Sequence, residues 1–279
     1  MADSIVEHVE LPKNDPRSVS ELISAALSDP NTYEDGGWDA VVALHWRGTE
    51  EVLERAARLC QSFCAVERRV GADILGQLGF AERSFTRERL NVLLKLLRRE
   101  TDLDVLYSVL IALGHVKEAD AIGPVARFRR HPDADIRYGV VFALLGLEEL
   151  AALDVLIELT RDEDAHVRDW ATFGLGTMVD QVDTPSLRDA LVQRLADSDE
   201  VVRSEALIGL ARRKDDRVVP ALLKELAADS VDVGVIEAAE LIADPQLHSP
   251  LVALRGRREG DDWLLEQAIL ACSLRPEIA

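Results

Sequence analysis

Residues 164–176 read DAHVRDWATFGLG, and two other stretches repeat their pattern: DADIRYGVVFALLG at 133–146 and DEVVRSEALIGLA at 199–211. In each, an aspartate precedes a Val-Arg or Ile-Arg pair. A small or apolar residue lies three positions after the arginine, and a leucine lies seven positions after it. The anchoring arginines are Arg137, Arg168 and Arg203. Self-similarity at a fixed period is the sequence signature of a repeat protein.

Weaker copies extend the repeat in both directions. One surrounds Arg68, one is centred on Leu106 in the arginine's place, and two degenerate copies lie at Gly234 and Trp263. Successive anchor positions are 38, 31, 31, 35, 31 and 29 residues apart. A period near 31 residues accommodates two helices of about 11 to 13 residues and two turns.

The first helix of each repeat is also visible. Five segments place apolar residues at i, i+3, i+4 and i+7, as an amphipathic helix does, and end in charged residues before an Asp-rich turn. They are residues 90–100, 121–131, 152–162, 187–197 and 218–228. Strand patterns are poor, and aromatic residues make up only 5% of the chain. The sequence therefore predicts an all-α array of helical hairpins.

Glycines and prolines recur at or near the ends of these helices. Four glycines are expected to close second helices in the left-handed conformation: Gly79, Gly114, Gly146 and Gly176. Prolines recur in first-helix segments, at positions 124, 220 and 250. At a helix start proline is tolerated, whereas deeper inside it bends the helix, and the sequence leaves both placements open.

The pattern V-R-x-x-A-x-x-x-L-G, as in VRDWATFGLG at 167–176, resembles the short bacterial HEAT-like repeats of the phycobilisome-lyase type. The resemblance covers about residues 49–270. It implies a right-handed α-α solenoid of about seven HEAT-like helical hairpins. Because such repeats serve many tasks, the resemblance is specific for fold and weak for function.

Three segments are expected along the chain. Residues 1–48 form an N-terminal helical cap, with short helices at 18–28 and 38–46, because a solenoid must cover the apolar edge of its first repeat. Residues 49–228 hold five clear repeats, and residues 229–279 hold degenerate repeats and a C-terminal cap.

Composition excludes several function classes. With 32 basic and 51 acidic residues the net charge is −19, which argues against a dedicated binder of nucleic acid or anionic membranes. The longest apolar run, 139–147, is about half a membrane span, and the N-terminus lacks a signal pattern. Three cysteines make no disulfide framework, so we expect a cytoplasmic protein with reduced thiols.

Enzymatic motifs are missing. The sequence holds no Walker-type loop, nucleophile elbow or dinucleotide fingerprint. Cys60 and Cys64 have no second ligand pair at zinc-like spacing. Deoxyhypusine hydroxylases, built on related repeats, bind iron through His-Glu dipeptides, and this chain contains none. We expect no metal, no cofactor and no catalytic residue, which favours a non-enzymatic protein.

The Asp–Arg element of each repeat favours a structural role. In HEAT repeats such residues form a ladder from one repeat to the next, so the resemblance implies an inter-repeat ladder. Its members are Asp135, Arg137, Asp164, Arg168, Asp199 and Arg203. The planar guanidinium suits this role because it can hold a carboxylate and a backbone carbonyl together.

The other face of the second helices is the candidate binding surface. Positions one and five after each anchor share a face by their i, i+4 spacing, and this face is expected to look into the concave side of the solenoid. The predicted partner-binding residues are Tyr107, Tyr138, Phe142, Asp169, Trp170, Phe173 and Ile208. Alternatively, these side chains fill the space between neighbouring second helices. For Phe142 and Phe173 the two interpretations are balanced, and for Ile208 the packed position is favoured.

An apolar ridge rimmed by acids is typical of a protein-recognition surface. The leading hypothesis is a scaffold or adaptor that binds a protein partner through the concave face, and the acidic balance favours a basic partner. An alternative from the resemblance is a phycobilin-lyase-like accessory protein. It would hold a prosthetic group in the same groove, with Asp169 or His166 nearby for proton transfer. The sequence does not indicate the oligomeric state.

Overall fold

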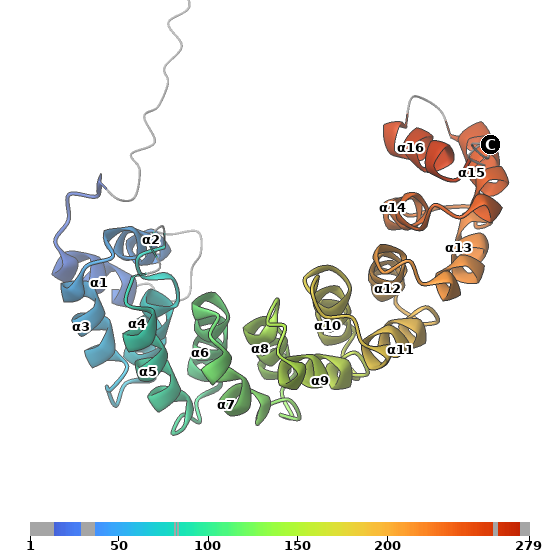
Figure 1. The fold of residues 1–279 in the computed structure, drawn as a ribbon. Coiled ribbons are helices and arrows are strands. Elements are labelled where there is room, and N and C mark those ends of the chain that lie inside the picture. The colour runs from blue at the N-terminus through green and yellow to red at the C-terminus, as the bar shows by residue number, and fades with distance from the viewer. Residues whose placement is uncertain (1–13, 29–36, 81, 83, 259–261, 274–279) are drawn as a thin grey trace, which may run out of the picture. The chain divides into compact units, whose positions relative to one another are not determined.

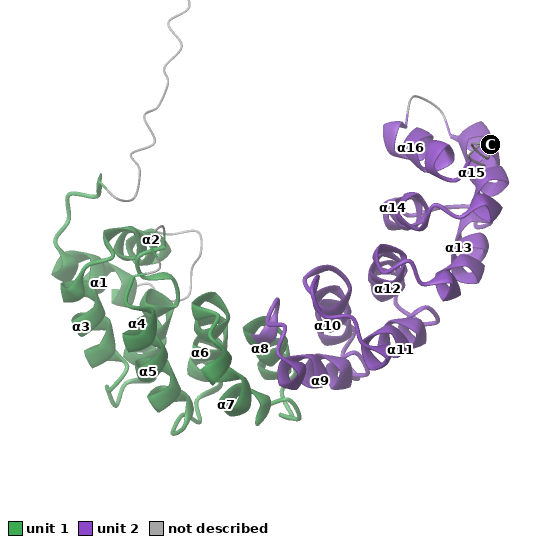
Figure 2. Ribbon diagram, viewed as in Figure 1, with its two compact units in different colours: residues 1–143 green, residues 144–279 purple. Residues whose placement is uncertain are grey.

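The structure is a computed structural model that describes residues 14–28, 37–80, 82, 84–258 and 262–273. Within these residues every regular element is an α-helix or a short 3-10 helix, so the all-α prediction is confirmed. None of the described helices combines the length and apolarity needed to cross a bilayer. The chain divides into two compact units, residues 1–143 and 144–279 (Figure 2).

Seven helical hairpins follow one another along the described chain, as the anchor spacing predicts. Their first helices are α3 (Glu50–Leu59), α5 (Thr86–Leu97), α7 (Ile122–Ala126), α9 (Leu150–Leu159), α11 (Pro185–Arg194), α13 (Val219–Leu226) and α15 (His248–Arg257). Their second helices are α4 (Ala65–Gln77), α6 (Leu103–Val116), α8 (Ala134–Leu144), α10 (Ala165–Thr177), α12 (Glu200–Arg212), α14 (Val233–Ile242) and α16 (Trp263–Ala271).

Within each unit the two kinds of helix form separate rows (Figure 1). In unit 1, α4 packs on α6; in unit 2, α10, α12, α14 and α16 pack on one another in sequence. This single-file stacking of hairpins makes the chain an α-solenoid.

The anchor-plus-seven leucines form the core. Five of them are fully buried: Leu75, Leu113, Leu144, Leu175 and Leu210. Each such leucine contributes roughly 1.5–3 kcal/mol by leaving water. The positions three after the anchors are buried as well, including Val140, Ala171 and Ala206. The +3 and +7 pattern read from the sequence is therefore the buried stripe of each second helix.

Aspartates cap most of the second helices, although α4 is preceded by Cys64, which makes no such bond. The Asp164 carboxylate accepts hydrogen bonds from the backbone N–H groups of His166 (2.9 Å) and Val167 (3.1 Å). Asp199 caps α12 in the same way. These bonds satisfy amide donors that lack a partner within the helix, and each cap contributes about 1 kcal/mol.

The glycine prediction is confirmed at two positions and wrong at two. Gly79 and Gly146 have φ angles of 67° and 66°, in the left-handed region. Gly114 and Gly176 instead lie inside α6 and α10. There the neighbouring helix comes too close for a side chain: a Cβ on Gly114 would lie 2.6 Å from Cδ1 of Phe142. Helix packing, not backbone conformation, requires glycine at these two sites.

The three recurring prolines lie in the first turn of their helices. Pro220 is the second residue of α13, and Pro124 and Pro250 are the third residues of α7 and α15. Each of these helices follows directly on a 3-10 turn: η2 (Ala119–Ala121), η3 (Asp216–Val218) or η4 (Pro245–Leu247). The question that the sequence left open is thus decided in favour of helix starts, where proline is tolerated.

Two helices precede the hairpins at the predicted places, α1 (Val19–Ser28) and α2 (Gly37–Arg47). The backbone N–H of Gly79 donates to the carbonyl of His45 at 2.9 Å, and Nε2 of His45 lies 2.9 Å from the carbonyl of Asp73. These contacts hold α2 against α4. Residues 1–13 and 29–36 of the expected N-terminal cap, and residues 259–261 and 274–279 of the expected C-terminal segment, lie outside the described residues.

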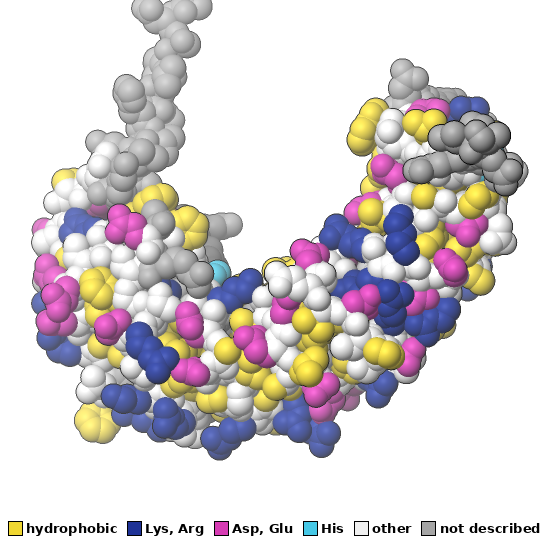
Figure 3. All heavy atoms as spheres, in the orientation of Figure 1, with side chains coloured by type: hydrophobic (Ala, Val, Ile, Leu, Met, Phe, Trp, Pro, Cys, Tyr) yellow, Lys and Arg dark blue, Asp and Glu magenta, His cyan; other side chains and the backbone are white. Residues whose placement is uncertain are grey.

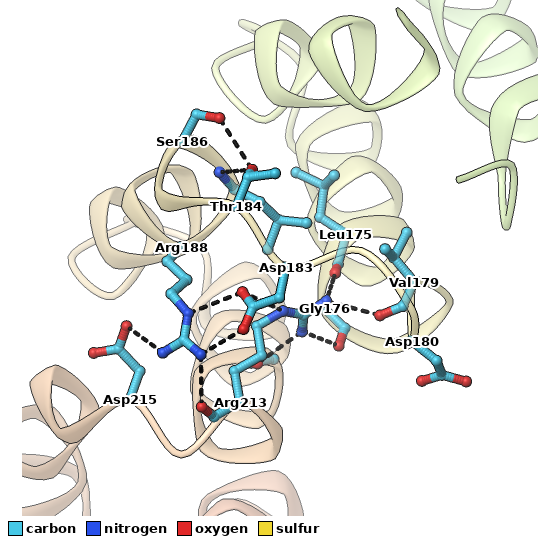
Figure 4. A network of polar contacts seen from close by, with 12 residues as sticks. Leu175, Gly176, Val179, Asp180, Asp183, Thr184, Ser186, Arg188, Arg213 and Asp215 are labelled. Carbon is cyan, nitrogen blue, oxygen red and sulfur yellow. Dashed lines mark hydrogen bonds and ion pairs between the residues drawn. The ribbon is translucent and has the colours of Figure 1, made fainter. Parts of the chain in front are cut away.

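A buried arginine closes the C-terminal end of α10. Arg213 donates to the carbonyls of Leu175 (2.7 Å), Gly176 (2.8 Å) and Val179 (2.8 Å), as Figure 4 shows. Beside it, Arg188 of α11 pairs with Asp183 and with Asp215, the latter at 3.2 Å. This network holds the last turn of α10 against α11 and α12, and so fixes the second-helix row of unit 2.

Candidate functional site

In unit 1, aromatic side chains connect α6 and α8. The rings of Tyr107 and Tyr138 are stacked, with centroids 6.4 Å apart and planes 22° apart. Both tyrosines are half-buried, so part of each ring remains accessible. Phe142 lies one turn beyond Tyr138, with its ring centroid 5.2 Å from that of His115, and it covers Gly114. Phe142 thus packs between α6 and α8, and like the two tyrosines it is half-buried.

Polar groups on α4 and α6 flank these aromatics. Burial raises the pKa of the Asp73 carboxyl to about 6, although a hydrogen bond with Ser108 and the nearby charge of Arg69 oppose the shift. Burial also lowers the pKa of His115, whose Nε2 lies 3.4 Å from Nε2 of Gln77. This part of unit 1 is therefore mixed in character, aromatic on α6 and α8 and polar on α4.

In unit 2 the aromatic cluster lies on α10. Trp170 and Phe173 meet edge to face at 5.6 Å between ring centroids, and His166 approaches Trp170 at 6.2 Å. Asp169, Trp170 and Phe173 are all half-buried. Ile208 on α12 differs, since it is only 8% exposed. A Cβ on Gly234 would lie 3.3 Å from its Cδ1, so Ile208 contributes to packing between α12 and α14.

Several carboxylates lie on or next to the second-helix row of unit 2. Burial raises the pKa of Glu205 on α12 to about 7, and the charges of Asp169, Glu237 and Asp232 add to the shift while Arg212 opposes it. Burial raises the pKa of Asp169 too. Sequence reasoning did not single out Glu205 or Glu237. The signal was present, because Glu205 follows Val201, and Glu237 follows Val233, at the i+4 spacing that places both side chains on one helix face.

The anchoring arginines join successive hairpins. Arg168 forms a bidentate pair with Asp197 of the next hairpin, both hydrogen bonds being 3.0 Å, and donates to the carbonyls of Asp162 and Glu163 in its own turn. The side chains of Arg168 and Asp197 are only 12% and 4% exposed. Arg203 reaches Glu225 of the next hairpin through a single contact of 3.3 Å. In unit 1 the weaker copy repeats the geometry, with Arg68 paired to Glu100 at 2.6 Å.

The aspartates named with these arginines occupy other positions. Asp164 and Asp199 cap their own helices, and Asp135 is exposed in the first turn of α8. The buried arginine Arg137 donates to the carbonyls of His131 and Pro132. Arg68 pairs with Glu100, and Arg168 pairs with Asp197. Each of these carboxylates lies six residues before the next anchor, in the motifs Glu100-x-Asp102 and Asp197-x-Asp199. This acid-x-Asp motif was the missed signal.

Two of the three cysteines are poor candidates for chemistry, because they are buried. Cys60 and Cys272 are buried, and burial raises their thiol pKa values to about 12 and about 11. A protonated thiol is neither a good nucleophile nor a metal ligand. Among the described side chains, no group of three or more His, Cys, Asp or Glu residues is arranged to hold a metal ion.

The family model for HEAT repeats matches residues 90–176 and 153–243, which together span more than half of the chain. The chain is a HEAT-repeat protein. The X-ray structure of YibA from Escherichia coli has 25% identity to it, with a TM-score of 0.74 and 92% of each chain covered. A search of curated proteins finds no match.

Larger solenoids share the fold. The structure of Kap95p with RanGDP matches 91% of this HEAT-repeat chain at 15% identity and a TM-score of 0.60, and importin beta matches 91% at 14% and 0.57. This chain covers only 40% and 42% of those chains. At such identities the likeness shows the architecture alone.

Proposed function

We propose that this HEAT-repeat protein is a non-enzymatic scaffold or adaptor that binds a protein partner through its rows of second helices. The HEAT solenoid is an architecture typical of protein-interaction scaffolds. The observation that carries the proposal is the set of part-exposed aromatic rings on those rows, Tyr107 and Tyr138 in unit 1 and Trp170 and Phe173 in unit 2. Tyrosine and tryptophan are enriched among residues that dominate binding energy.

The scaffold also limits the entropic cost of binding. The capped helices, the arginine–carboxylate pairs between hairpins and the network around Arg213 hold each row before a partner arrives. Because few side chains then have to be ordered on association, more of the contact energy appears as affinity. The net charge of −19 favours a basic partner through electrostatic steering.

The test is affinity capture from a lysate of the source cells, with mass spectrometry, using the wild type and two variants. Tyr107→Ala/Tyr138→Ala removes the stacked pair on the second-helix row of unit 1. Leu150→Ala, on the first-helix row, removes a side chain that is 63% exposed and serves as control. We expect a protein captured by the wild type and by Leu150→Ala but at least tenfold less by the tyrosine variant.

Two outcomes would count against the proposal. Equal capture by all three proteins would exclude the tyrosine pair of unit 1 from the binding surface. No specific protein at either 50 mM or 300 mM salt, together with a stoichiometric absorption shift when a bilin is added, would favour the phycobilin-lyase-like alternative. The shift would then also support the phycobilisome-lyase-type subfamily.

A further inference from the structure

Exposed apolar side chains begin three successive second helices of unit 2. Val201 on α12 is 50% exposed, Val233 on α14 is 60% exposed and Trp263 on α16 is 72% exposed. All three lie in the first turn of their helices. A single exposed apolar residue is ordinary, but one in the first turn of each of three neighbouring helices makes a recurring apolar edge.

A carboxylate lies one turn further along each of these helices. Glu205 follows Val201 by four residues, Glu237 follows Val233 by four, and Glu266 follows Trp263 by three. Residues three or four apart lie above one another on a helix face. An acidic stripe thus runs beside the apolar edge, and in Figure 3 acidic and hydrophobic side chains intermingle along α10 to α16, together with basic ones.

The acidic stripe is only partly neutralised. Arg212 lies 3.8 Å from Glu237, and Arg255 lies 3.3 Å from Glu266. Around Glu205, the three carboxylates of Asp169, Asp232 and Glu237 oppose ionisation, and Arg212 alone favours it. Carboxylates that lie close together repel one another when ionised, and a bound cation reduces this repulsion. The charge of this surface therefore selects a cationic occupant.

We propose that the second-helix row of unit 2 binds a basic segment of a partner protein. Its arginine or lysine head groups would lie against Asp169, Glu205 and Glu237, while their aliphatic stems cover Val201 and Val233, since long cationic side chains bury their methylene groups on apolar surface. This inference rests on the proposed function and names the chemistry of its partner. Packed helices lie about 8–10 Å apart, and three residues of extended chain span about 10 Å, so basic residues at every third position match the row.

The probe is the peptide acetyl-(Arg-Gly-Gly)4-amide, titrated into the full chain by isothermal calorimetry at pH 8 and low salt. Acetyl-(Glu-Gly-Gly)4-amide is the charge-reversed control. Glu205→Gln removes the central carboxylate. Asp154→Asn removes one negative charge from an exposed position on α9, in the same unit but on the first-helix row, and is the matched control.

We expect the arginine peptide to bind, the glutamate peptide not to bind, and Glu205→Gln to weaken binding at least fivefold while Asp154→Asn changes it less than twofold. Absence of binding by the arginine peptide, or equal weakening by both variants, would overturn the inference. A protein captured equally well by the wild type and Glu205→Gln, but lost with Tyr107→Ala/Tyr138→Ala, would overturn it while supporting the proposed function. Binding of the arginine peptide without any captured protein would support the inference and count against the proposed function.

Discussion

At the scale of single residues, the carboxylates of this chain differ in what compensates their burial. Asp197 lies between Arg168 and Arg194, and these pairings lower its pKa in spite of burial. Asp73 and Glu205 lack compensation of that strength, and burial raises the pKa of both. The ionised Asp197 therefore helps to hold two hairpins together. Ionisation of Asp73 or Glu205 instead lowers the stability of the fold.

Asp73→Asn should stabilise the protein at neutral pH. The pKa of Asp73 is raised from 3.8 to about 6, so the unfolded chain loses this proton before the folded chain does. A stabilising contribution present at acid pH is then lost as the pH rises through about 6. We expect the variant to gain about 1–3 kcal/mol in free energy of unfolding at pH 7.5 and less than half of that at pH 4.5, measured by urea denaturation.

The exposed Asp154→Asn change is the control for net charge, and it should leave the difference between the two pH values as in the wild type. A destabilised Asp73→Asn variant at pH 7.5 would show that the hydrogen bond with Ser108 outweighs the cost of burying the charge.

At the scale of elements, the contact between second helices depends on glycine. A Cβ on Gly209 of α12 would lie 2.6 Å from Cα of Gly176 on α10, whereas a Cβ on Gly123 of α7 would meet nothing within 4 Å. In both places alanine is the better helix former. The two glycines thus separate the effect of close packing from that of helix propensity.

Gly209→Ala should lower the free energy of unfolding by about 1–3 kcal/mol, because the added methyl forces two helix backbones apart. Gly123→Ala should raise it by about 0.4–1 kcal/mol, since alanine loses less conformational entropy on folding and gains no clash. Thermal unfolding of the two variants beside the wild type measures both effects. If Gly209→Ala also stabilised the protein, α10 and α12 would not be in backbone contact.

At the scale of the whole molecule, the period and the buried stripe could be predicted from the sequence because they depend on local spacing alone. The exposed surface could not be predicted in this way, because the exposure of a side chain depends on which residues the next hairpin places beside it. Ile208 packs closely on Gly234 of α14, a residue without a side chain, and is buried, whereas Phe173 at the equivalent position of α10 is half-buried. Likewise, the charge environment of Glu205 on α12 includes Asp169 on α10 and Glu237 on α14, which lie 68 residues apart along the chain.

The same nearest-neighbour construction makes the response to a core defect local. In a solenoid each hairpin contacts only its neighbours, so stability is a sum of repeat and interface contributions. Leu175→Ala in α10 should cost about 2–5 kcal/mol by leaving a cavity, and should raise amide hydrogen exchange in α9 to α12, which contact α10 or its hairpin. Exchange in α1 to α4 should stay at its wild-type rate. Leu150→Ala, the same change at an exposed site, is the control, and a uniform rise across all helices would mean that the array unfolds as one cooperative block instead.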